Sequence, residues 1–165
     1  MTASTQNGST ITSLQDSLQW EGHWPTVGPK IVRNVQRPPL ALLEKFKTAF
    51  TPDLSDHVGA LYTMDSAVRA LYQNSPKLVG IALTVKIPRT DNTSVHEALR
   101  WVQPGDVLVV DARGDTESCG TGAGSLMPPI DRGLAGVVVD GAWRDIAELE
   151  AIQFPISGRA ISPFS

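Results

Sequence analysis

Residues 133–151 have the sequence GLAGVVVDGAWRDIAELEA, which indicates the fold class. Its first half contains the unbroken apolar run from Val137 to Val139, which is typical of a strand buried on both faces of a sheet. Its second half, from Trp143 onward, has the length and pattern of a short helix. A buried strand that leads directly into a helix is the building unit of α/β proteins with parallel strands.

The same alternation of strands and helices continues on both sides of this stretch. Residues 77–88 predict a strand with alternating apolar residues, and residues 90–102 predict a capped helix. Residues 104–111 predict a turn followed by an apolar strand, and residues 154–162 predict a final strand and turn. Nearer the N-terminus, three helices are expected: one from Pro38 to Phe50, a second capped by Ser55 or Asp56, and a third over 66–73. We therefore expect an α/β domain with a partly parallel sheet.

Composition narrows the class of protein. The chain has 165 residues, which suits about one domain, and 41% hydrophobic and 19% charged residues, which excludes disorder of the whole chain. Its net charge of −3 provides no field to hold a nucleic-acid backbone, so we expect no nucleic-acid partner. No apolar run approaches the roughly 18 residues of a membrane span, and no signal peptide is recognisable. Cys119 is the only cysteine, which excludes an intramolecular disulfide. We expect a cytoplasmic protein without a membrane partner.

The first 37 residues differ from the rest of the chain. Residues 1–19 are mostly Ser, Thr, Gln and Asn and predict a flexible tail. Residues 20–37 carry Trp20 and Trp24, which indicate an arm that packs on its own domain or on a neighbouring subunit. The Pro and Gly content of this arm argues against regular secondary structure. The predicted boundaries are therefore 1–37 for the tail and arm and 38–165 for the domain.

Two apolar strands are each predicted to end in an acidic residue, Asp111 and Asp140. Ligands bind at the carboxyl ends of strands in open α/β sheets, although both aspartates also suit ordinary turns. The segment CGTGAGS, residues 119–125, offers backbone N–H groups around Gly122 that could hold a carboxylate or phosphate. The alternative is a flexible loop. The segment is not a P-loop, because no Gly-Lys-Ser/Thr follows it.

Arg144 and Asp145 open the predicted helix after the second apolar strand. A carboxylate in the first turn stabilises a helix electrostatically, so a structural role for Asp145 competes with a functional one. Asn92 and His96 flank the start of the helix predicted over 90–102 and are further candidates. No His-x-x-His or His-Glu-x-x-His spacing is present, and no flanking motif marks Cys119 as a nucleophile.

Taken together, these motifs resemble the RraA-like family, which contains the 4-hydroxy-4-methyl-2-oxoglutarate aldolases, oxaloacetate decarboxylases and regulators of ribonuclease E activity. The resemblance runs from about Leu40 to the end of the chain, and residues 133–163 are its most specific part. There, Arg144-Asp145 followed by Glu148 fits the family signature Arg-Asp-x-x-Glu/Asp. The resemblance implies a three-layer α/β fold of the swivelling-domain type, assembled as homo-oligomers, either trimers or hexamers. Longer members continue with further strands, so the chain is expected to be short at its C-terminus.

The resemblance also implies a site. Asp145 would hold a divalent metal, Mg²⁺ or Mn²⁺, with Glu148 as a second candidate ligand, and Arg144 would face the keto oxygen of a small 2-oxo acid. The backbone N–H groups of the glycine segment would receive the substrate carboxylate; these residues are Gly122, Ala123, Gly124 and Ser125, with Asn92 and His96 as further binding candidates. The metal and the guanidinium would stabilise an enolate. The expected function is a metal-dependent carbon–carbon lyase, either an oxaloacetate decarboxylase or a pyruvate-forming aldolase.

Two departures from the family bear on activity. The aldolases carry an acidic residue where the helix after the glycine opens, and this chain has Ala123 there. Proline inside a helix costs about 3 kcal/mol or more, so Pro128 and Pro129 are predicted to disrupt that helix. Aldol cleavage needs a base for the substrate hydroxyl, whereas decarboxylation of oxaloacetate does not. We therefore expect decarboxylation to be favoured over aldol cleavage.

Three carboxylates are candidates to replace the missing acid, namely Asp115, Glu117 and Glu148. Two other functions also remain open for this sequence. The chain could keep the fold without the chemistry and act as a regulatory or binding protein. It could also be a family member recruited to another reaction in a specialised biosynthetic pathway, with a pocket rebuilt around Cys119, His96 and Asn92.

Overall fold

A computed structural model of the chain describes residues 11–13, 30–32 and 35–164. The chain divides into two compact units, residues 1–38 and 39–165. In the first unit, β1 (Ile11–Ser13) pairs antiparallel with β2 (Lys30–Val32), with Ile11 opposite Val32. This corrects the expectation of an arm without regular structure, because a three-residue ladder needs only a short segment free of proline. Trp20 and Trp24 lie outside the described residues.

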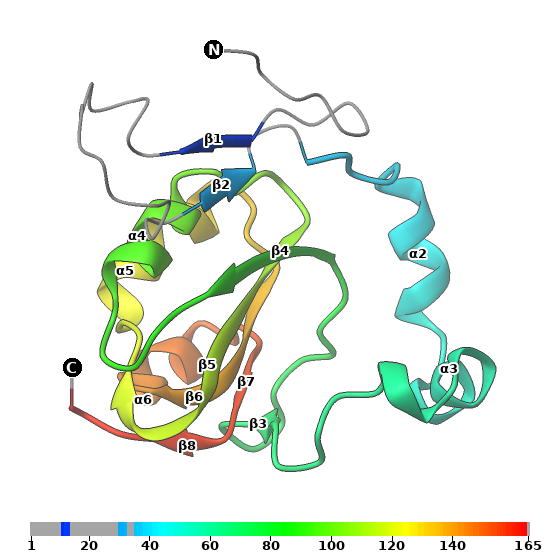
Figure 1. The fold of residues 1–165 in the computed structure, drawn as a ribbon. Helices are drawn as coiled ribbons and strands as arrows, with labels where there is room; N and C mark the ends of the chain where they lie inside the picture. Colours follow the sequence, from blue (N-terminus) through cyan, green and yellow to red (C-terminus); the bar gives the residue numbers. More distant parts are fainter. Residues whose placement is uncertain (1–10, 14–29, 33–34, 165) are drawn as a thin grey trace. The chain divides into compact units, whose positions relative to one another are not determined.

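The second unit is built on one mixed sheet (Figure 1). Its strands lie in the order β3 (Arg69–Ala70), β7 (Ile156–Gly158), β6 (Gly136–Trp143), β5 (Asp106–Cys119) and β4 (Ile81–Lys86). The four strands from β7 to β4 run parallel, β3 is antiparallel to β7, and β8 (Ala160–Ile161) pairs with the end of β6. The predicted α/β fold with a partly parallel sheet is confirmed.

Three helices pack together on one side of this sheet, α4 (Thr93–Leu99), α5 (Ala123–Asp131) and α6 (Ile146–Ala151) (Figure 1). The core between these helices and the strands is closed, with Leu108, Val137, Val139, Leu126 and Leu149 fully buried. The alternation predicted for β4 holds: Ile81 and Leu83 are buried, while Ala82 and Thr84 are exposed. Within the described residues, no helix is long and apolar enough to cross a membrane.

The helices before the sheet differ in part from the prediction. The first expected helix is α2 (Ala41–Lys47), and the second is α3 (Thr51–Val58), followed by the short helix η1 (Ala60–Tyr62). Ser55 and Asp56 lie inside α3 rather than at its N-cap, because Pro52 suits the first turn. The helix expected over 66–73 is absent from the structure; Asp65 accepts a hydrogen bond from the backbone of Ala67, and residues 69–70 form β3 against β7.

Strands β5 and β6 both run past the acidic residues that were expected to end them. β5 continues from Asp111 to Cys119 with two register shifts against β6, and β6 continues from Asp140 to Trp143. Asp111 and Asp140 are therefore not at the carboxyl ends of their strands. The irregular pairing explains the error, because bulged segments lose the period of two on which strand prediction depends.

Helix α5 includes both prolines, which corrects the expectation that they would disrupt it. Pro128 and Pro129 stand in its second half, and the helix continues to Asp131. The prolines cost two backbone hydrogen bonds, because neither residue has an N–H to donate. Burial of Ala123, Leu126 and Pro129 against the core offsets that loss and keeps the segment helical.

Candidate functional site

The candidate site lies at the junction between the end of β6 and the start of α6. Ala142 and Trp143 are buried, and they fix the backbone that carries Arg144 and Asp145 out of the sheet. Asp145 is the N-cap residue of α6 and has a left-handed backbone, with φ 58° and ψ 37°. Only Gly, Asn and Asp adopt this conformation readily, and strained residues of this kind are concentrated at functional sites.

The Asp145 carboxylate lies against the N-terminus of α5. Its Oδ2 accepts a hydrogen bond from the backbone N–H of Ala123 at 3.2 Å. The contact requires Gly122, because a Cβ atom at that position would lie 2.0 Å from the same oxygen. The predicted glycine segment is therefore the N-terminus of a helix with a backbone donor at Ala123, and the structure brings it together with Asp145.

Arg144 completes the group. Its Nε lies 3.7 Å from Asp145 Oδ2, and both side chains are about two-fifths exposed, at 38% and 40%. A cation, a carboxylate and a helix N-terminus thus share one partly open place on the surface. This combination can hold an anion and stabilise negative charge that develops on a bound molecule.

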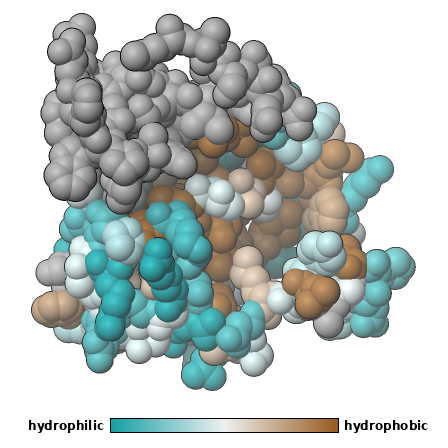
Figure 2. Space-filling model, viewed as in Figure 1, coloured by the Kyte–Doolittle hydropathy of each residue, from teal (hydrophilic) through white to brown (hydrophobic). Residues whose placement is uncertain are grey.

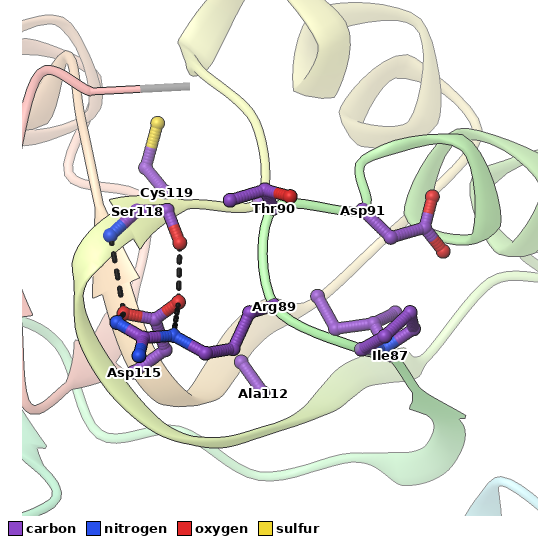
Figure 3. A pocket seen from close by; sticks show the side chains of 10 residues that line it. Ile87, Arg89, Thr90, Asp91, Ala112, Asp115, Ser118 and Cys119 are labelled. Atoms are coloured by element: carbon purple, nitrogen blue, oxygen red, sulfur yellow. Dashed lines mark hydrogen bonds and ion pairs between the residues drawn. The ribbon is translucent and has the colours of Figure 1, made fainter.

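Cys119 lies beside this group but is not suited to nucleophilic chemistry. Its side chain is buried, and burial raises the pKa of the thiol, while the nearby Arg144 guanidinium partly opposes that effect. The thiolate is the reactive form of cysteine, so a raised pKa leaves the residue inert near neutral pH. Its sulfur also points away from the Asp115 carboxylate (Figure 3).

A second polar cluster, which the sequence did not predict as a unit, lies in the irregular part of β5. The Asp115 side chain is 2% exposed, and its two oxygens accept hydrogen bonds from Arg89 Nε and Nη2 at 3.1 and 3.3 Å (Figure 3). It also accepts hydrogen bonds from the Ser118 hydroxyl and from the backbone N–H groups of Glu117 and Ser118. Arg89 holds the pKa of the Asp115 carboxyl well below its usual range.

This cluster removes one of the three candidates for the missing acid, Asp115. Asp115 is buried and fully engaged, and a carboxylate held in this way is a poor base, because its partners stabilise the charged form. Glu117 is exposed and pairs with the same Arg89 at 2.8 Å. The cluster fixes the path of β5 toward the glycine segment.

The two other aspartates of the sheet also have structural partners. Asp111 pairs with Lys86 at 2.8 Å, and this contact, together with the backbone N–H of Arg113, lowers its pKa. Asp140 pairs with Arg159, which also bonds Asp65 at 3.0 Å. The interpretation as ordinary structural residues therefore fits Asp111 and Asp140 better than the functional one.

The remaining predicted site residues lie on three helices, α4, α5 and α6. Asn92 is the N-cap residue of α4, and His96 lies one turn later, exposed. His96 and Ser125 line the same groove between the two helices. Gly124 is exposed within α5, and Glu148 is exposed in the first turn of α6.

The residues at this site fit a hydrated divalent cation. The described part of the chain has no group of three His, Cys, Asp or Glu side chains that could enclose a metal. Mg²⁺ needs no such group, since it usually keeps several waters and binds through one or two carboxylates. The Asp145 side chain is open to water and can supply that carboxylate. Glu148 stays a predicted second ligand.

Comparison with known sequences places residues 51–165 in the sequence model of a family described as RraA-like, Aldolase/RraA. A protein of Halalkalibacterium halodurans named "Putative 4-hydroxy-4-methyl-2-oxoglutarate aldolase" is 39% identical over 114 residues, which cover 69% of this chain and 54% of that protein. A Burkholderia multivorans protein of the same name is 35% identical over 123 residues, covering 70% and 73%. The chain spans about half the length of the first of these relatives.

Two solved structures share the fold at 29% identity. The RNA-processing inhibitor RraA from Thermus thermophilus has a TM-score of 0.59, with 71% of this chain and 70% of that chain covered. Streptomyces coelicolor RraAS2, described as an unusual member of the RNase ES inhibitor RraA protein family, has a TM-score of 0.65, with 78% and 67% covered.

Proposed function

Since the chain belongs to the RraA-like family, we propose that it is a carbon–carbon lyase that depends on a divalent metal and acts on a small 2-oxo acid. The reaction is decarboxylation of oxaloacetate or a pyruvate-forming aldol cleavage. The single observation that carries this proposal is the meeting of Asp145, Arg144 and the N-terminus of α5 at one place. The relatives named as 4-hydroxy-4-methyl-2-oxoglutarate aldolases support the same reaction class.

The chemistry follows from these groups. In oxaloacetate the bond that breaks joins the second carboxylate to the carbon next to the keto group. Its electron pair moves toward the keto oxygen as carbon dioxide leaves, which gives the enolate of pyruvate, and the enolate carbon then takes a proton from water. Arg144 faces the oxygen on which that charge develops, and its guanidinium stabilises the charge in a partly water-excluded place. The N-terminus of α5, at the glycine segment from Gly122 to Ser125, attracts the substrate carboxylate, while the N–H of Ala123 donates to Asp145 Oδ2. Asp145 holds Mg²⁺ or Mn²⁺, which supplies Lewis-acid stabilisation of the same oxygen when bound.

Pyruvate release from oxaloacetate by the purified protein tests this function. The rate with Mg²⁺ or Mn²⁺, corrected for the metal-only background, is expected to fall to that background in EDTA and in Asp145→Ala. Restoring the metal after EDTA is expected to restore the wild-type rate only. A wild-type rate that does not exceed the metal-only background would contradict the lyase proposal.

The residue at position 123 predicts which substrate is preferred. Ala123 is fully buried at the start of α5 and provides no carboxylate to take a proton from a substrate hydroxyl. A positioned base is worth roughly 10²–10⁴-fold in rate, so decarboxylation of oxaloacetate is expected to be at least tenfold faster than aldol cleavage of 4-hydroxy-4-methyl-2-oxoglutarate. Pyruvate formation from the two substrates, followed with the same assay, gives this ratio directly. Equal rates would show that another group acts as the base.

Ala123 also favours a second candidate function, a regulatory or binding protein without the chemistry. The two solved structures described as RNA-processing or RNase inhibitors support this alternative. Metal dependence separates the two candidates. A protein that binds its partner equally well with metal, with EDTA and as Asp145→Ala is regulatory.

We also propose that the protein acts as a homo-oligomer in the cytoplasm. Large apolar side chains are exposed along α2, α3 and the segment after them, including Phe50, Leu61 and Tyr62 at 73%, 97% and 81%. Figure 2 shows apolar surface in brown on the side of the molecule where α2 lies. Contiguous apolar surface of this kind is typical of protein interfaces. Whether the assembly is a trimer or a hexamer follows from its mass in solution.

A further inference from the structure

A groove of about 220 Å³ lies between α4 and α5. Leu99, Pro128 and Pro129 form its apolar part, and the polar residues that line it are His96, Arg100, Ser125 and Arg132. The groove is open to solvent and large enough for a small metabolite. Ser125 stands at the same end of α5 as Ala123, but the groove lining includes neither Arg144 nor Asp145.

The residues that line the groove include three basic side chains but no acidic ones. Arg132 donates to the carbonyl of Leu99 at 2.7 Å, so its guanidinium is fixed at the groove wall and keeps further donors. Arg100 contacts Glu97 at 3.5 Å with 78% of its side chain exposed, and such a pair contributes too little to hold it away from a ligand.

Pro129 changes the backbone chemistry of the same groove. An α-helical carbonyl accepts a hydrogen bond from the N–H four residues later. Pro129 has no N–H, so the carbonyl of Ser125, a residue that lines the groove, lacks its α-helical donor. A carbonyl in this state favours a ligand that brings a hydroxyl group as donor. The groove therefore combines cations for an anionic group with an acceptor for a hydroxyl.

We propose that this groove binds a small hydroxylated dianion, such as a sugar phosphate or a hydroxydicarboxylate. Arg100, Arg132 and His96 bind the anionic groups, since guanidinium forks match both phosphate and carboxylate oxygens. The Ser125 carbonyl accepts from a hydroxyl, and the proline rings pack on the carbon skeleton. The binding does not depend on the lyase function, because the groove residues and the Asp145 group are different side chains.

Isothermal titration calorimetry of the full chain tests the proposal, in EDTA so that no divalent metal is present. Glycerol 3-phosphate and malate are the two probes, and binding of either one identifies the source of the dianion. Propyl phosphate and succinate are the matched probes without a hydroxyl, and we expect them to bind several-fold more weakly. Equal affinity of the matched probes would overturn the role of the Ser125 carbonyl.

Variants assign the binding to the groove. Arg100→Gln is expected to weaken binding by about tenfold or more, and the exposure of this side chain means that the variant folds. Lys45→Gln removes an equivalent cation from the last turn of α2 and is expected to leave binding unchanged. Asp145→Asn is also expected to leave it unchanged. No heat with either probe at millimolar concentration, or a loss in Asp145→Asn equal to that in Arg100→Gln, would overturn the proposal.

Discussion

Gly122→Ala is expected to lower the rate of oxaloacetate decarboxylation by about 100-fold or more while the protein stays folded. The new Cβ would lie 2.0 Å from Asp145 Oδ2 and 2.9 Å from Arg144 Nε, so both side chains must leave their places. Displacement of a positioned group by about 1 Å costs on the order of 10²-fold in rate. The backbone at Gly122 has φ −114°, which alanine adopts freely, and the atoms it meets are the ends of movable side chains.

Gly124→Ala is the matched control for this prediction. It adds the same methyl group two residues later, where nothing lies within 4 Å of the new atom. Because glycine inside a helix is unfavourable, this variant is expected to gain roughly 0.5–1 kcal/mol of stability at an unchanged rate. Steady-state rates and urea unfolding curves of both variants measure the two effects. If Gly122→Ala retains the wild-type rate, the contact between Asp145 and α5 has no part in the reaction.

Asp115→Ala is expected to destabilise the fold by about 3 kcal/mol, the largest effect on stability that we predict. The substitution leaves Arg89, the Ser118 hydroxyl and two backbone N–H groups without the carboxylate that they share. Glu117→Ala is the control, because it removes an exposed partner of the same Arg89 and is expected to cost less than about 1 kcal/mol. Urea unfolding at neutral pH gives both values. A cost for Asp115→Ala no larger than for Glu117→Ala would contradict the structural role of the cluster.

The pH dependence of this effect has a definite sign. The pKa of Asp115 is depressed in the folded protein, so the unfolded chain binds a proton first as the pH falls. The stabilisation is therefore complete above the unfolded pKa of about 3.9 and is lost as the pH falls below it. The difference in unfolding free energy between wild type and Asp115→Ala is expected to be constant from about pH 6 to about pH 5 and to shrink below about pH 4, toward about pH 3 and lower. A difference that stays constant down to about pH 3 would mean that packing, not charge, makes Asp115 important.

Much of the fold and part of the site could be predicted from the sequence. β4, α4, β6 and α6 have clear periodicity, and the paired residues Arg144 and Asp145 lie at a strand–helix junction as expected. The Arg89–Asp115 cluster could not be predicted, because its members are 26 residues apart and meet only through the bulged part of β5. The helix expected over 66–73 was wrong because pairing with β7 outweighs local helix propensity. The course of α5 was wrong for a related reason, since burial of one helix face overrides the cost of two prolines.

The left-handed backbone of Asp145 limits which residues natural variation can place at that position. Asparagine and glycine both accept this conformation, and each differs from aspartate by a single base in the codon. A single base change can therefore remove the carboxylate without straining the backbone. Glutamate would keep the negative charge, but the left-handed backbone is unfavourable for it. A lineage with this fold can accordingly lose the proposed chemistry in one mutational step and still retain its architecture and its surfaces for other partners.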